Sequence, residues 1–284
     1  MDAVPRDSVH YREYDVSVDG FNIHFLEWGE KGSVIVLLHG SWPWGMARNL
    51  DHLSEPLSRE YRVIVPDLPG FGLSDDPSSE MGFKEQIEIL HEAIKQIGLE
   101  KCTFVGISYG GLFSMAWPAL YPEDINGSIS LDMPPTRYSD PLPRDPRSQA
   151  QPFPDRFSNT EEALEYCAKV YPGFSREYML NQLIIGGIRD DGVVTPPSPS
   201  SRRRLLRWDR DFWVDLEGIK TSILLVYGSD SHFFSSELVE KMKSANGKLS
   251  LKRVEGATHY LPMTHVEETL EAVKSFMKKL QTQV

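Results

Sequence analysis

A serine flanked by glycines is the strongest chemical signal in the sequence. Residues 106–110 (GISYG) follow a β-branched run at 102–105 and precede a helical pattern that begins at Leu112. Such a turn presents a serine hydroxyl at the edge of a sheet, and glycines flank it because larger side chains would clash. The positive end of the following helix favours negative charge that develops near the serine. We therefore predict that Ser108 is a nucleophile.

His259 is the candidate general base. It follows a predicted strand at 249–254 and precedes an amphipathic segment at 266–280 that predicts the last helix. A serine hydroxyl is a poor nucleophile at neutral pH, whereas an imidazole that titrates near pH ~6.5 can take its proton and return it to the leaving group. His265 lies at the start of the predicted helix, and we expect it to cap the helix or to lie on the surface.

Two aspartates compete for the role of the acid. Asp132 follows a predicted strand at 128–131, and Asp230 follows another at 222–227. Either carboxylate could hold the tautomer of the imidazole and stabilise the imidazolium ion. An aspartate at a strand end can also simply cap a turn. Asp132 is the favoured acid, and Asp230 remains the alternative.

The segment at 39–42 (HGSW) supplies a candidate oxyanion hole. It follows a predicted strand at 33–38. A glycine-containing turn at this place can aim a backbone N–H at a tetrahedral oxyanion, and the second donor is the N–H of the residue after the nucleophile. We assign these donors to Ser41 and Tyr109. Trp42 would neighbour the oxyanion hole, and His39 is expected to brace the turn.

Alternating strand and helix patterns must position these residues. Period-2 segments at 11–18 and 21–28, joined by Asp19-Gly20, predict a β-hairpin. Apolar runs at 33–38, 62–65, 102–105, 128–131 and 222–227 are typical of strands buried in a parallel sheet, and helical patterns lie between several of them. This alternation predicts an α/β fold with a mostly parallel, doubly wound sheet.

Residues 133–220 break the alternation. The segment starts with a proline-rich run and contains helical patterns near 161–170 and 176–185, with capping-box spacing at 158–161. We predict a helical cap inserted after the sixth strand. The predicted domains are therefore a core at 1–132 and 221–284 and a cap at 133–220.

Composition excludes several classes of function. The chain has 284 residues, 40% hydrophobic and 25% charged, with a net charge of −11. This charge disfavours nucleic acid and anionic bilayers as partners. The two cysteines, Cys102 and Cys167, indicate no disulfide framework, and no metal-ligand spacing or phosphate loop occurs. No apolar run suits a signal peptide or a membrane span, so we expect a cytoplasmic protein without cofactors; the sequence favours no oligomeric state.

Four motifs in order resemble the α/β-hydrolase superfamily, in the branch with a helical cap: HGSW at 39–42, DLPGFGLS at 67–74, GISYGG at 106–111 and GATH at 256–259. The resemblance covers nearly the whole chain outside the insertion. It implies the α/β-hydrolase fold, a Ser-acid-His triad in chain order, a substrate pocket under the cap and a structural role for the loop at 67–74.

The resemblance also bears on the acid. The superfamily usually places Gly-x-x-Asp after the strand at 222–227, whereas Asp230 arrives one residue early after Gly228. Some members carry the acid after the preceding strand, where Asp132 stands. The segment at 131–135 (LDMPP) is similar to that of zearalenone-type lactone hydrolases.

Aromatic residues of the predicted cap could line an apolar pocket with Trp42 and Phe233. They are Tyr138, Phe153, Phe157, Tyr166, Tyr171, Phe174, Tyr178, Trp208, Phe212 and Trp213. Trp208 and Trp213 are preferred because they lie just before the chain re-enters the sheet. The other interpretation is that most of these aromatics form the core of the cap.

The sequence therefore predicts a cofactor-free serine hydrolase of a small to medium hydrophobic ester or lactone. The same residues could serve a carbon-carbon (β-diketone) hydrolase or a thioesterase. A non-hydrolytic lyase or ligand-binding protein on this fold is the alternative from another class. A serine at position 108 argues against epoxide hydrolases and haloalkane dehalogenases, which resemble this fold but need a carboxylate there.

Overall fold

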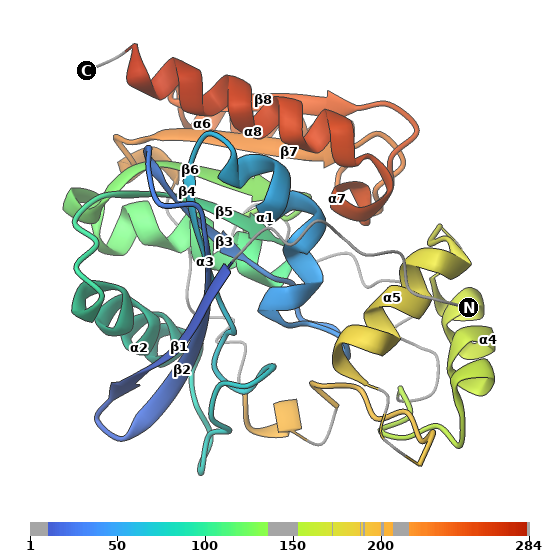
Figure 1. Cartoon of the computed structure of the whole chain (residues 1–284). Helices are drawn as coiled ribbons and strands as arrows, with labels where there is room; N and C mark the ends of the chain where they lie inside the picture. Colours follow the sequence, from blue (N-terminus) through green and yellow to red (C-terminus); the bar gives the residue numbers. More distant parts are fainter. Residues whose placement is uncertain are drawn as a thin grey trace.

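An eight-stranded sheet lies at the centre of the molecule (Figure 1). The computed structural model describes residues 11–135, 153–171, 173–187, 189, 191–199, 202–206 and 216–282. The strands are β1 (Tyr11–Val18), β2 (Phe21–Trp28), β3 (Val34–Leu38), β4 (Arg62–Pro66), β5 (Cys102–Ile107), β6 (Ile125–Leu131), β7 (Ser222–Gly228) and β8 (Leu249–Val254). Their spatial order is β1-β2-β4-β3-β5-β6-β7-β8. The pairs β1/β2 and β2/β4 are antiparallel, and all other pairs are parallel.

The first two strands form the predicted hairpin. Asp19 and Gly20 connect them with φ values of 50° and 86°. Positive φ at both central residues is what a type I′ turn requires, and its twist matches the twist of the flanking strands. The observed strands have the predicted limits.

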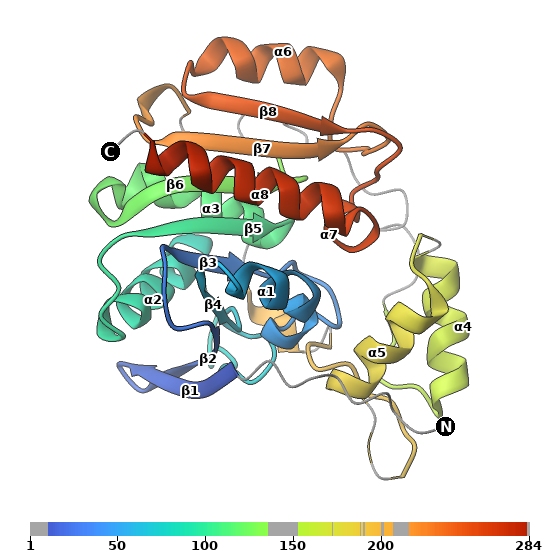
Figure 2. The same ribbon diagram turned by 45° about the horizontal axis from the view of Figure 1, so that its top comes forward.

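Helices cover both faces of the sheet (Figure 2). One face carries α1 (Asp51–Ser58) and α8 (Val266–Gln281), and the other carries α2 (Phe83–Gln96), α3 (Tyr109–Leu120) and α6 (Ser236–Ala245). Short helices η1 (Ala47–Leu50), η2 (Pro122–Asp124) and α7 (Leu261–Thr264) join the layers. In α2, the apolar side chains of Phe83, Ile87, Leu90 and Ile94 are buried, because their spacing places them on one helical face.

The chain between β6 and β7 holds α4 (Thr160–Val170), α5 (Arg176–Gly186), η5 (Arg202–Leu205) and η6 (Leu216–Gly218). Figure 2 shows α4 and α5 beyond the carboxyl ends of the parallel strands. They share a small core that includes Leu164, Met179 and Leu183. The cap of α4 is Asn159, whose side chain accepts from the Glu162 N–H, and not Ser158 as the capping-box spacing suggested.

The predicted fold class is confirmed, with a mixed but mostly parallel sheet and an insertion after the sixth strand. The strands β4, β5, β6 and β7 are each longer than the apolar runs that predicted them. The limits of the cap at 133 and 220 stay a prediction. Within the described ranges, no helix has both the length and the apolar character that crossing a membrane requires.

Candidate active site

Ser108 lies in a strained turn between β5 and α3. Its φ of 52° and ψ of −111° are unusual for a residue with a side chain, and its N–H donates to Leu131 O at 3.2 Å. Glycines are required on both sides: a Cβ at Gly106 would overlap Gly110 O, and a Cβ at Gly110 would overlap Leu38 O. The close approach of these backbones forces the turn and lifts the serine hydroxyl off the strand.

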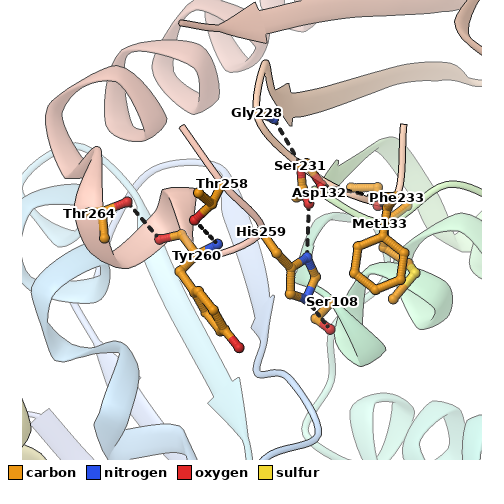
Figure 3. A network of polar contacts seen from close by, with 11 residues as sticks. Ser108, Asp132, Met133, Gly228, Ser231, Phe233, Thr258, His259, Tyr260 and Thr264 are labelled. Carbon is orange, nitrogen blue, oxygen red and sulfur yellow. Dashed lines mark hydrogen bonds and ion pairs between the residues drawn. The ribbon is translucent and has the colours of Figure 1, made fainter. Parts of the chain in front are cut away.

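His259 meets Ser108 from the other end of the chain (Figure 3). It lies in the turn between β8 and α7, and its Nε2 is 2.9 Å from Ser108 Oγ. Its Nδ1 is 2.8 Å from Asp132 Oδ2. A carboxylate only accepts hydrogen bonds, so Nδ1 carries the proton and Nε2 is left to accept from the serine hydroxyl. This tautomer is the one that a general base needs.

Asp132 is the aspartate that reaches His259. Its side chain is fully buried, and its φ of 55° lies in the left-handed region that aspartate tolerates. Besides His259, the Gly228 N–H donates to Oδ1 at 2.8 Å and the Ser231 hydroxyl donates to Oδ2 at 2.5 Å. These hydrogen bonds compensate the burial of the carboxylate, which would otherwise be costly.

Asp230, the alternative acid, is directed elsewhere. The residue is exposed, and its Oδ1 accepts a hydrogen bond from Ser229 Oγ at 2.8 Å. Its backbone N–H donates to Ala257 O at 2.9 Å, which fixes the turn. The position one residue early after Gly228 therefore turns this side chain to solvent, and among the described residues Asp132 is the hydrogen-bonded acid partner of His259.

The two assigned oxyanion donors belong to backbone segments close to Ser108. Tyr109 is the first residue of α3, directly after Ser108. Ser41 follows Gly40, and a Cβ at Gly40 would lie only 3.3 Å from Ser108 Cβ. The Tyr109 side chain is buried and its hydroxyl donates to Gln86 Oε1 at 2.7 Å, so only the backbone of Tyr109 is available to the reaction.

His39 braces the turn that carries Ser41. The ring is 1% exposed, with Nδ1 3.0 Å from Gly40 O, and Nε2 accepts the Leu68 N–H at 3.0 Å. Burial lowers the pKa of His39 from 6.5 to about 4, although the Gly40 carbonyl opposes this shift. His39 is therefore neutral at physiological pH and ties the turn to the loop at 67–74.

An aromatic cluster joins the cap to this site. The Trp42 ring lies edge-on to Tyr171 and Phe174, with centroids 5.6 and 5.9 Å apart. The centroid of the Tyr260 ring lies 4.9 Å from that of Phe174 and 5.5 Å from that of His259. Tyr260 thus links the aromatic cluster to the imidazole.

The other predicted pocket residues have different outcomes. Phe233 lies beside the base, with its ring centroid 4.5 Å from that of His259 (Figure 3). Trp208 and Trp213 lie outside the described residues. Several cap aromatics, Phe157 among them, instead pack in the core of the cap around the buried Trp44.

Sequence reasoning missed two residues of the site. Tyr260 directly follows the base, and its adjacency to His259 was the available signal. Ser231 stands three positions after Gly228, where the Gly-x-x-Asp pattern places an acid.

No group of three His, Cys, Asp or Glu side chains in the described part of the chain has the arrangement of metal ligands.

Comparison with curated proteins finds relatives that are named as hydrolases. A 3-hydroxybutyrate-oligomer hydrolase of Cupriavidus necator is 24% identical over 255 residues, which cover 83% of this chain and 86% of that protein. A 2-hydroxy-6-oxononadienedioate/2-hydroxy-6-oxononatrienedioate hydrolase of Escherichia coli is 34% identical over 116 residues. That match covers only 38% of this chain and 39% of the relative's length.

Comparison with solved structures supports the fold. The crystal structure of E-2-(acetamidomethylene)succinate hydrolase superposes with a TM-score of 0.76 at 21% identity, covering 95% of this chain and all of that one.

The sequence profile described as the alpha/beta hydrolase family matches residues 35–272. This match spans the turn with Ser41, the elbow with Ser108 and the turn with His259, so the chain belongs to the alpha/beta hydrolase family.

Proposed function

We propose that the protein is a serine hydrolase that cleaves a small to medium hydrophobic carboxylic ester or lactone. One observation carries this proposal: His259 bridges Ser108 Oγ at 2.9 Å and the buried Asp132 carboxylate at 2.8 Å. Those distances allow proton transfer without rearrangement. Ser108 serves as the nucleophile, His259 as the base and Asp132 as the acid.

The reaction proceeds through an acyl-enzyme. Ser108 Oγ attacks the substrate carbonyl while its proton passes to His259 Nε2, and the imidazolium ion is stabilised by Asp132. The N–H groups of Ser41 and Tyr109 bind the oxyanion, aided by the N-terminus of α3. The carbonyl re-forms, His259 protonates the leaving alkoxide, and a water molecule then releases the acid by the same steps in reverse order.

The aromatic cluster supports an apolar substrate. The rings of Tyr260 and Phe233 contact the His259 imidazole, and the rings of Trp42, Tyr171 and Phe174 continue the cluster from Tyr260. Aromatic surface of this kind binds hydrocarbon groups. A compact ester or lactone with an aliphatic or aromatic acyl group fits this chemistry.

The test measures hydrolysis of p-nitrophenyl acyl esters of increasing chain length and of a set of lactones. Ser108→Ala is expected to lower kcat/KM by about 10³-fold or more, because the residual rate comes from binding and the oxyanion hole alone. A fluorophosphonate probe should label the wild-type protein and not Ser108→Ala. Equal rates and equal labelling of the two proteins would refute the proposal.

Carbon-carbon bond hydrolysis is the second candidate. It is favoured by the similarity to the Escherichia coli 2-hydroxy-6-oxononadienedioate/2-hydroxy-6-oxononatrienedioate hydrolase. Cleavage of a β-diketone with kcat/KM well above that for every ester and lactone would favour it, and a preference for acyl thioesters would favour a thioesterase. Product formation without incorporation of heavy oxygen from labelled water would indicate a lyase.

A further inference from the structure

The turn after β7 holds the acid that β6 supplies. Asp132 directly follows β6, and its N–H donates to Val226 O of β7 at 2.8 Å. The Gly228 N–H donates to Asp132 Oδ1 at 2.8 Å, and the Ser231 hydroxyl donates to Oδ2 at 2.5 Å. Figure 3 shows Gly228, Ser231 and His259 around the same carboxylate. The β7 turn therefore sets the orientation of a side chain on the neighbouring strand.

Ser231 contacts the same oxygen atom as the base. Asp132 Oδ2 accepts from both Ser231 Oγ and His259 Nδ1. The last torsion of an aspartate side chain is broad, so the carboxylate plane needs partners to fix it. Ser231 is itself only 5% exposed, and its Oγ also accepts the Phe233 N–H at 3.3 Å, which fixes the hydroxyl in turn.

We propose that Ser231 is a positioning residue for Asp132: its hydroxyl holds Oδ2 in the orientation that receives His259 Nδ1. The proposal rests on the proposed function, since its readout is the reactivity of Ser108. Loss of the Ser231 hydroxyl should therefore weaken the base through Asp132.

The first experiment removes the hydroxyl. Ser231→Ala is expected to lower kcat toward the best p-nitrophenyl ester by about 10- to 100-fold, the effect typical of partners that orient a reacting group, with KM nearly unchanged. Ser231→Thr keeps a hydroxyl and should retain most of kcat. Asp230→Asn, an exposed change in the same turn, is the matched control and should leave kcat unchanged.

A double-mutant cycle then tests the coupling between Asp132 and Ser231. Asp132→Ser should lower kcat by up to about 10⁴-fold, and adding Ser231→Ala to it should cost nothing further, because the hydroxyl acts only through Asp132. Fluorophosphonate labelling rates should follow the same order, and thermal melting and circular dichroism check that each variant is folded.

Two results would overturn the proposal: wild-type kcat in folded Ser231→Ala, or equal losses from Ser231→Ala with and without Asp132. The Ser231→Ala and Ser231→Thr pair decides the positioning role even if a variant at Asp132 does not fold. Failure of the proposed function looks different, because the wild-type protein and Ser108→Ala would then show equal rates and equal labelling.

Discussion

His39 is buried in its neutral form, and this predicts a specific loss of stability in acid. Its Nε2 accepts the Leu68 N–H, so protonation would set two N–H groups against each other inside the core. Burial lowers the pKa of His39 to about 4, while an unfolded chain restores a value near ~6.5. Between these two values the unfolded state binds a proton that the native state does not, so stability rises with pH across this window.

The magnitude follows from linkage. On going from about pH 7.5 to about pH 5.0, His39 should reduce the free energy of unfolding by about 2 kcal/mol. This contribution is complete above the unfolded pKa and is lost as the pH falls toward the folded pKa. Replacing His39 with a residue that does not titrate removes the pH-dependent part and leaves a pH-independent loss, which comes from the packing against Phe71 and the hydrogen bond with the Leu68 N–H.

The assay compares wild type with His39→Gln by urea unfolding at both pH values, with tryptophan fluorescence as the probe and the m-value as a check on two-state behaviour. At the higher pH the wild-type protein should have a larger free energy of unfolding than His39→Gln. This difference between the two proteins should decrease by about 2 kcal/mol at the lower pH. All other titrating groups are common to both proteins and cancel. If the difference in free energy of unfolding between the two proteins is the same at both pH values, the assignment of His39 as a buried neutral histidine is refuted.

Two further predictions concern stability. Gly110→Ala should lower the free energy of unfolding by about 2 kcal/mol or more and Tm by roughly 5 °C, because its Cβ would overlap Leu38 O; Gly247→Ala, where a Cβ meets nothing within 4 Å, should leave Tm unchanged in the same melting experiment. Tyr178→Phe should leave the free energy of unfolding unchanged or raise it by up to about 1 kcal/mol, because the Tyr178 hydroxyl is buried without a hydrogen-bond partner among the described residues. Urea unfolding measures it, and a loss above about 1 kcal/mol would show that the hydroxyl has a stabilising partner.

The local features of the site could be predicted because their causes are local. Glycines are needed around Ser108 because neighbouring backbone segments approach closely there, and the motif itself contains these glycines. The positive φ values at Asp19 and Gly20 follow from the residue types. The periodicity of apolar residues gave the strands and helices of the core, because each element buries one face or two in a regular way. These signals need no knowledge of distant contacts.

The sequence favoured Asp132 as the acid and left Asp230 open as the alternative. Both residues follow strands of one parallel pair, so their backbones lie at the same edge of the sheet. The distinction depends on the path of the turn after Gly228, which sends Asp230 to solvent and brings Ser231 onto the Asp132 carboxylate. Turn conformation across two neighbouring strands is a property of their pairing and not of either segment.

The division between sequence and tertiary structure follows the range of the interactions. The sequence by itself determined the serine in its elbow, the histidine after the last strand and the order of strands and helices, since short-range sterics and periodicity specify each of them. The tertiary structure decided between Asp132 and Asp230, brought the rings of Phe233 and Tyr260 against the imidazole and placed the Ser231 hydroxyl on the Asp132 carboxylate. These contacts join side chains from separate strands and turns, and only the folded chain brings them together.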